Sequence, residues 1–129
     1  RSHVLLMMPT AFSEEKILPP GMRLLRLAGH INANNAPEVR AEVTGLLSEG
    51  YKTFVFDFSE VADIDSVGIG AFFTMAKLST DAGGSVRIFG ATTLIKKTLE
   101  LAHLTHYVAL YTDLESALAG RAENSAARN

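Results

Sequence analysis

The feature that most constrains this fold is the alternation of apolar, strand-like segments with segments of helical periodicity. Strand patterns cover Met22 to Leu27, Thr53 to Phe58, Val86 to Phe89 and Tyr107 to Tyr111, and helical patterns cover about 37–48, 66–80, 92–104 and 113–119. Strands joined through a helix run parallel, because the crossover returns the chain to the same end of the sheet. The order predicts an α/β fold, with a mostly parallel, mixed sheet of about five strands covered by about four helices.

The two ends of the chain are predicted to depart from this regular order. Val4 to Met8 is apolar and is predicted to form an additional edge strand. We therefore divide the chain into an N-terminal extension at 1–20, a single domain at 21–120 and a flexible tail at 121–129. The sequence begins at Arg1 without an initiator Met, so the possibility that it belongs to a longer protein stays open.

Composition excludes several classes of function. The chain has 129 residues, 47% of them apolar, and a net charge of −2 with the basic residues scattered, so direct nucleic-acid binding is not expected. There is no cysteine, which excludes disulfides and thiolate catalysis. The longest unbroken apolar run, Val4 to Met8, is too short to span a bilayer, and we expect no membrane insertion and a cytoplasmic location.

The segment from Asp57 to Gly70 carries the strongest functional pattern. A buried strand ends, a short turn follows, and Asp65-Ser66 opens a helix. Either Asp65 or Ser66 can cap the first amides of that helix. A Ser66 hydroxyl at the positive end of a helix would suit a phosphate, although the Asp65 carboxylate opposes it. The simpler alternative is that this Asp-Ser pair is only a helix cap.

The helix that follows has an unequal distribution of side chains. A wide arc of roughly 200° is predicted to pack on the sheet and the neighbouring helices; it holds Val67, Ile69, Ala71, Phe72, Met75, Ala76 and Leu78. The outward column holds Ser66, Gly70, Phe73 and Lys77. Gly70 permits close approach, Phe73 offers an anchor and Lys77 adds charge, which favours a docking surface. The alternative is that Phe73 folds into a groove of its own protein.

The run Phe54 to Gly70, with its Asp65-Ser66-Val67-Gly68-Ile69-Gly70 segment, resembles the signature of STAS domains. This is the sulfate-transporter and anti-sigma-factor-antagonist family. The similarity extends upstream to Leu25–Asn32 and downstream through Val86–Phe89 to the helix ending at Leu104, so it covers roughly residues 22–119.

The resemblance implies a non-enzymatic partner switch. In antagonists of this family, an anti-sigma factor that is also a serine kinase phosphorylates the serine after the aspartate, and a serine phosphatase resets it. The unphosphorylated form binds the kinase and frees a sigma factor. The acceptor would be Ser66, flanked by Asp65, Val67 and Gly68, and the partner would meet Ile69, Gly70, Phe73, Lys77 and Asn32. Asn32 stands where the family often has an acidic residue, and Val67 replaces a commonly small or hydroxylated one.

Two other uses of the same fold stay open. The protein could be a STAS subunit of a lipid-transport ABC system or a domain of an anion transporter, in which the helix after Ser66 docks on the transporter. The apolar surface near Phe73 would also suit a homodimer.

Enzymatic and metal-dependent chemistry is not expected. A serine hydrolase would need glycine two residues before Ser66, where Ile64 stands. The spacing of Asp57, Asp63 and Asp65 matches only the start of an EF-hand loop. His103 and His106 have no other ligand beside them in the sequence. We therefore expect no metal and no cofactor.

Overall fold

The computed structural model describes residues 18–122. The strand predicted at Val4 to Met8 and most of the predicted C-terminal tail lie outside the described residues. Within them the sheet has four strands, where about five were expected.

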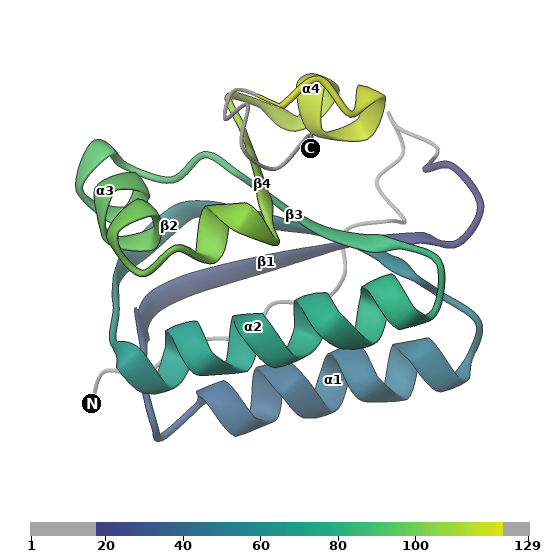
Figure 1. Ribbon diagram of the computed structural model, residues 1–129, viewed down its shortest axis with the longest axis horizontal. Coiled ribbons are helices and arrows are strands. Elements are labelled where there is room, and N and C mark those ends of the chain that lie inside the picture. Colours follow the sequence, from purple (N-terminus) through teal and green to yellow (C-terminus); the bar gives the residue numbers. More distant parts are fainter. Residues whose placement is uncertain (1–17, 123–129) are drawn as a thin grey trace.

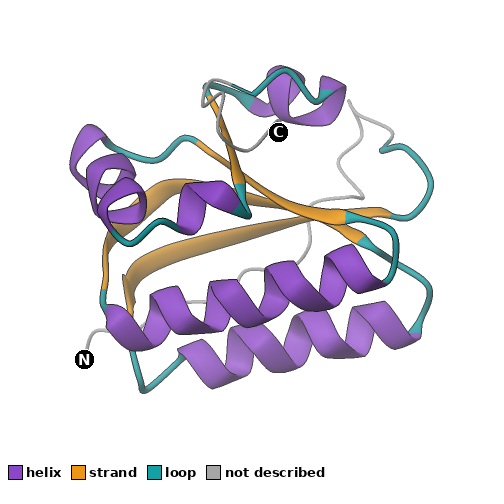
Figure 2. Cartoon of the chain, viewed as in Figure 1, coloured by secondary structure: helices purple, strands orange, loops and turns teal. Residues whose placement is uncertain are grey.

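The chain alternates between strands and helices, as predicted, and builds one parallel sheet (Figures 1 and 2). Its elements are β1 (Met22–Ile31), α1 (Ala36–Ser48), β2 (Thr53–Ile64), α2 (Ser66–Asp81), β3 (Ser85–Phe89), α3 (Thr93–Leu101), the short 3₁₀ helix η1 (Leu104–His106), β4 (Ala109–Tyr111) and α4 (Leu114–Ala119). The spatial order is β1-β2-β3-β4, and every neighbouring pair is parallel. Helices α1 and α2 lie side by side along one face, and α4 lies on the opposite side (Figure 1).

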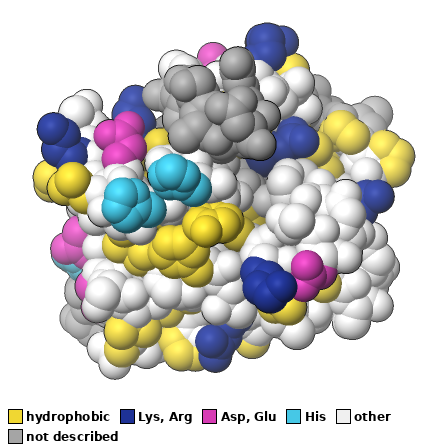
Figure 3. All heavy atoms as spheres, viewed as in Figure 1, with side chains coloured by type: hydrophobic (Ala, Val, Ile, Leu, Met, Phe, Trp, Pro, Cys, Tyr) yellow, Lys and Arg dark blue, Asp and Glu magenta, His cyan; other side chains and the backbone are white. Residues whose placement is uncertain are grey.

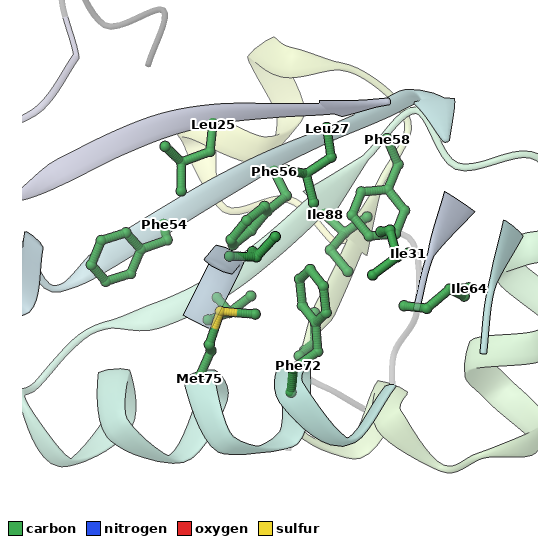
Figure 4. Packing of buried hydrophobic residues seen from close by; sticks show 14 of the residues in the cluster. Leu25, Leu27, Ile31, Phe54, Phe56, Phe58, Ile64, Phe72, Met75 and Ile88 are labelled. Carbon is green, nitrogen blue, oxygen red and sulfur yellow. The ribbon is translucent and has the colours of Figure 1, made fainter. Parts of the chain in front are cut away.

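The main core lies between the sheet and the pair α1 and α2. Alternate residues of β2 point to this side, and Phe54, Phe56 and Phe58 are fully buried there. Phe72 of α2 packs edge-on against Phe56 and Phe58, with ring centroids 4.9 and 5.5 Å apart (Figure 4). This aromatic contact fixes α2 against β2 and so determines where the start of α2 lies.

A smaller core covers the other face of the sheet. It consists of Met22, Leu24, Val55, Tyr111 and Ala117. The Arg87 side chain of β3 donates to the carbonyl oxygen of Ala117 at 2.6 Å, which attaches the end of α4 to the sheet.

The first two strands are longer than the apolar pattern predicted. β1 continues past Leu27, and β2 continues past Phe58 with polar residues before it ends at Ile64. Their pairing persists through two register shifts, one between Arg26 and Ala28 and one between Gly29 and His30. The extension brings the last residues of both strands to the edge of the sheet where α2 begins.

Side chains cap three of the helices, and one of them is Asp65, a cap candidate from the sequence. Asp65, Thr92 and Asp113 each accept a hydrogen bond from the backbone amide three residues later. Thr92, and not the neighbouring Thr93, therefore caps α3. The last strand starts later than predicted, at Ala109, because the chain first forms η1.

Candidate functional site

The candidate site is the junction at which β2 ends and α2 begins. Asp65 has an extended backbone, and its Oδ1 accepts a hydrogen bond from the Gly68 amide at 3.0 Å. The Asp65 amide in turn donates to the carbonyl oxygen of Ile31 at 3.0 Å, which ties the junction to the end of β1. Asp65 is therefore the cap of α2, and the Ser66 hydroxyl is not needed for that purpose.

Ser66 is the first residue of α2 and is exposed. Its hydroxyl stands where the unsatisfied amides of the first turn concentrate partial positive charge. Val67 was expected on the packed face, but this was wrong, because its side chain is 47% exposed. The first turn of α2 thus offers a hydroxyl and an apolar side chain together on the surface.

Gly68 lies inside the fold at this junction. A Cβ atom at this position would lie 2.8 Å from side-chain carbons of both Ile31 and Ile64 and 3.1 Å from the Ile31 carbonyl oxygen. Only glycine lets α2 approach the ends of β1 and β2 so closely. Gly68 therefore determines how closely the first turn of α2, which carries Ser66, packs on the ends of β1 and β2. Gly68 itself is buried.

The predicted outward column of α2 is only partly outward. Gly70 is exposed, and nothing would contact a Cβ atom there. Lys77 is exposed and forms an ion pair with Asp81 at 3.3 Å. Phe73, expected to project into solvent, is half-buried, as is Ile69, and both pack against the main core. The alternative, in which Phe73 folds against its own protein, describes its position better.

Phe73 is one of the residues that line a groove between α2 and η1. The groove has a volume of about 990 Å³ and is lined mainly by the second half of α2 together with His106 and Tyr107. The Phe73 and Tyr107 rings meet edge to face with centroids 5.5 Å apart, and Tyr107 is 62% exposed. Figure 3 shows hydrophobic side chains gathered in this region, next to histidines. The sequence did not indicate Tyr107 as part of this surface, because it was expected to begin a strand.

A second, smaller pocket lies at the ends of β1 and β2, and Asp65, which precedes Ser66 in the sequence, lines it. It has a volume of about 470 Å³ and is lined by His30, Asn32, Asp63, Ile64 and Asp65. His30 Nδ1 lies 2.9 Å from Asp63 Oδ2 across the ends of β1 and β2. The sequence analysis left His30 without a role, although the carboxyl ends of parallel strands are where sites in α/β proteins form.

Asn32 reaches this pocket from the turn after β1. Its Oδ1 accepts from the Asn34 amide at 2.9 Å, and its own amide donates to Asn35 Oδ1 at 2.9 Å. Asn35 is buried, and its Nδ2 donates to the carbonyl oxygen of His30 at 2.8 Å. The hydrogen bonds of Asn32 and Asn35 therefore stabilise the turn that follows His30, as expected of residues that favour turns.

The three aspartates considered as metal ligands have different partners. Asp57 is buried and accepts from Arg26 Nε at 3.1 Å and from the amide and hydroxyl of Ser59. Asp63 contacts His30, and Asp65 caps α2. Within residues 18–122, no three His, Asp or Glu side chains are arranged so that they could hold a metal ion together. In the same part of the chain, no helix is both long enough and apolar enough to cross a bilayer.

Comparison with solved structures places the fold among known proteins. An NMR structure of the protein TM1081 is similar over 79% of this chain and 82% of its own, with a TM-score of 0.72 at 22% identity. The unphosphorylated anti-sigma factor antagonist SpoIIAA is similar over 92% and 96%, with a TM-score of 0.70 at 17% identity. An anti-sigma factor antagonist from Mycobacterium paratuberculosis is similar over 93% of both chains, with a TM-score of 0.71 at 18% identity.

The family comparison is more specific than the structural one. No curated protein sequence matches the chain. The family model described as the STAS domain matches residues 15–117, which include every strand and nearly all of the helical structure. The chain belongs to the STAS domain family.

Proposed function

We propose that this protein is a cytoplasmic, non-enzymatic partner switch that is controlled by phosphorylation of Ser66. In its unphosphorylated form it binds an anti-sigma factor that has serine kinase activity, which releases a sigma factor for transcription. Phosphorylation ends this binding, and a serine phosphatase restores it. The observation that carries the proposal is the exposed Ser66 hydroxyl at the start of α2, left uncommitted because Asp65 caps the helix.

The surface around Ser66 suits a switch of this kind. Val67 is exposed beside the hydroxyl, and Gly70 presents no side chain one turn further along α2. A partner packed closely on this surface would meet a phosphate of about −1.5 to −2 charges once Ser66 is modified. Burying that charge is costly, so the complex would dissociate while the fold stays intact.

Support for this function also comes from the relatives of known description. The similar structures include an anti-sigma factor antagonist solved in an unphosphorylated form and a cell fate determinant of Bacillus solved in a phosphorylated form. The sequence Asp65-Ser66 lies in the segment that resembles the phosphorylated segment of these antagonists.

The test uses purified protein, a candidate anti-sigma-factor kinase encoded beside its gene, and Mg-ATP. Mass spectrometry should find one phosphate on Ser66, and Ser66→Ala should bind the kinase like wild type but remain unmodified. Ser66→Asp should weaken binding, measured by calorimetry, by about tenfold or more, which corresponds to roughly 1.4 kcal/mol. The proposal is wrong if Ser66→Asp binds as tightly as wild type.

Thr93 provides a matched control. It is likewise the exposed first residue of a helix, α3, and the preceding Thr92 caps that helix just as Asp65 caps α2. Thr93→Asp adds the same charge at an equivalent helix position and should leave kinase binding unchanged. Equal losses from both substitutions would show a general charge effect and would contradict a specific role for Ser66.

A second use of the fold is supported by similarity to transporter proteins. The murine anion transporter Slc26a9 is similar over 100% of this chain but only 23% of its own, with a TM-score of 0.68 at 12% identity. In this second function, the protein would be a subunit or domain that docks on a transporter through α2. Co-purification with a transporter subunit that is unaffected by Ser66→Asp would favour this second function.

A further inference from the structure

The smaller pocket holds a histidine, and its lining residue Asp65 directly precedes the proposed phosphorylation site, Ser66. His30 and Ser66 are each adjacent in sequence to a member of the hydrogen-bonded pair Ile31 and Asp65. His30 also lines the same pocket as Asp65, and its side chain is 41% exposed. The segments that carry the two side chains are therefore joined by a backbone hydrogen bond, although the two residues are 36 positions apart in the sequence.

The charges around His30 are mostly negative. Asp63 and Asp65 line the pocket with it, and Glu60 lies on β2 opposite Ala28, close to the strand position of His30. Arg26, the nearest arginine on β1, is engaged by Asp57. Within the residues that line this pocket, His30 is thus the side chain able to carry a positive charge.

The contact with Asp63 fixes how His30 can act. Because Nδ1 faces Asp63 at 2.9 Å, the imidazole ring is held in place and Nε2 is its second donor when the ring is protonated. Imidazole ordinarily changes charge between pH 5 and 8, which is also where a phosphomonoester gains its second negative charge.

We propose that His30 is the countercharge of phosphorylated Ser66, so that proton binding by His30 and phosphorylation of Ser66 favour each other. The inference rests on the proposed function, because it assigns a residue to the phosphorylated state of the same site. Phosphorylation places a second strong negative charge beside the Asp65 carboxylate, and protonated His30 offsets this repulsion. Linkage makes the effect reciprocal, so acidification stabilises the phosphorylated, partner-free state.

The direct test follows the histidine side chains by NMR over a pH titration. Two proteins are compared, one with serine and one with phosphoserine inserted at position 66 during translation. The titration midpoint of His30 should rise by a few tenths of a pH unit to about one when phosphoserine is present. His103 and His106, on the α3–η1 side of the protein, serve as internal controls and should not shift. An unchanged His30 midpoint, or an equal rise in all three, would overturn the inference.

The reciprocal test follows the phosphate by ³¹P NMR. In the phosphoserine protein, His30→Gln should raise the midpoint of the phosphate titration, because the neutral amide no longer stabilises the dianion. His106→Gln is the matched control and should leave that midpoint unchanged. If His30→Gln also leaves it unchanged, the phosphate and His30 do not interact and the inference fails.

These experiments separate the inference from the proposed function. Phosphoserine is installed without a kinase, so the coupling is measured whether or not a kinase recognises the protein. A kinase that never modifies Ser66 contradicts the proposed function alone, and uncoupled titrations contradict the role of His30 alone.

Discussion

At the scale of single residues, the two glycines in the first turns of α2 have different roles, one in the core contact and one on the exposed surface. Gly68 is buried against Ile31 and Ile64, whereas Gly70 is exposed with free space around it. Their roles differ because the first lets the helix approach the sheet and the second leaves a smooth external surface. This difference can be measured.

Alanine substitutions should separate the two glycines. Gly68→Ala should lower the free energy of unfolding by about 1–3 kcal/mol, because the new methyl group overlaps Ile31 and Ile64. Gly70→Ala should raise it by about 0.5–1 kcal/mol, because alanine favours the helix and meets nothing. Urea unfolding monitored by circular dichroism checks both. Effects of the same sign would contradict the packing described here.

At the scale of elements, α2 depends on Asp65 for its first turn. The Asp65 carboxylate accepts a hydrogen bond from the Gly68 amide and so caps the first turn of the helix. The helix cap and the hydroxyl that we propose as the phosphate acceptor thus belong to adjacent residues.

Removal of the cap should destabilise the protein without affecting the hydroxyl. Asp65→Ala should reduce the free energy of unfolding by about 1 kcal/mol, whereas Asp65→Asn should preserve most of the stability, because asparagine also accepts from the helix amides. Thermal unfolding of the two variants beside wild type is the measurement. If alanine and asparagine are equally stable, Asp65 does not act as a cap.

The order and type of the elements could be predicted from sequence, but their lengths and faces could not be. β2 continues through Ser59 and Glu60 because pairing with β1 persists after the apolar pattern stops. Val67 was assigned to the wrong face, and Phe73 is half-buried where an outward position was expected. The cause is that α2 is apolar on most of its circumference, so its neighbours decide which side is covered. The contact of His30 with Asp63 depends on the register shift between Gly29 and His30, which the sequence pattern does not predict.

At the scale of the whole molecule, the smaller core holds β4 and α4 on the second face of the sheet. Tyr111 lies in this core, and burial raises the pKa of its phenol above 10.0, partly offset by the positive charge of Arg87. The unfolded chain therefore releases this proton at a lower pH than the folded protein does. Stability from this group is complete below about pH 10 and is lost as the pH rises through the folded-state pKa.

Alkaline unfolding tests this arrangement. The free energy of unfolding of wild type should decrease above about pH 10, and Tyr111→Phe should weaken that dependence, because phenylalanine cannot ionise. Tyr107→Phe, at a tyrosine 62% exposed, is the control and should retain the wild-type slope. Denaturation series at several pH values supply the data. Equal slopes for Tyr111→Phe and wild type would show that Tyr111 ionisation does not contribute.

The separation of the helix cap, Asp65, from the neighbouring hydroxyl of Ser66 has a consequence for how often one molecule can be reused. Because Asp65 and not Ser66 caps α2, a phosphate ester at the Ser66 hydroxyl could be formed and hydrolysed many times without unfolding of the domain. Under the proposed function, each cycle of modification then begins from the same intact molecule, and no newly synthesised copy is needed to reverse it.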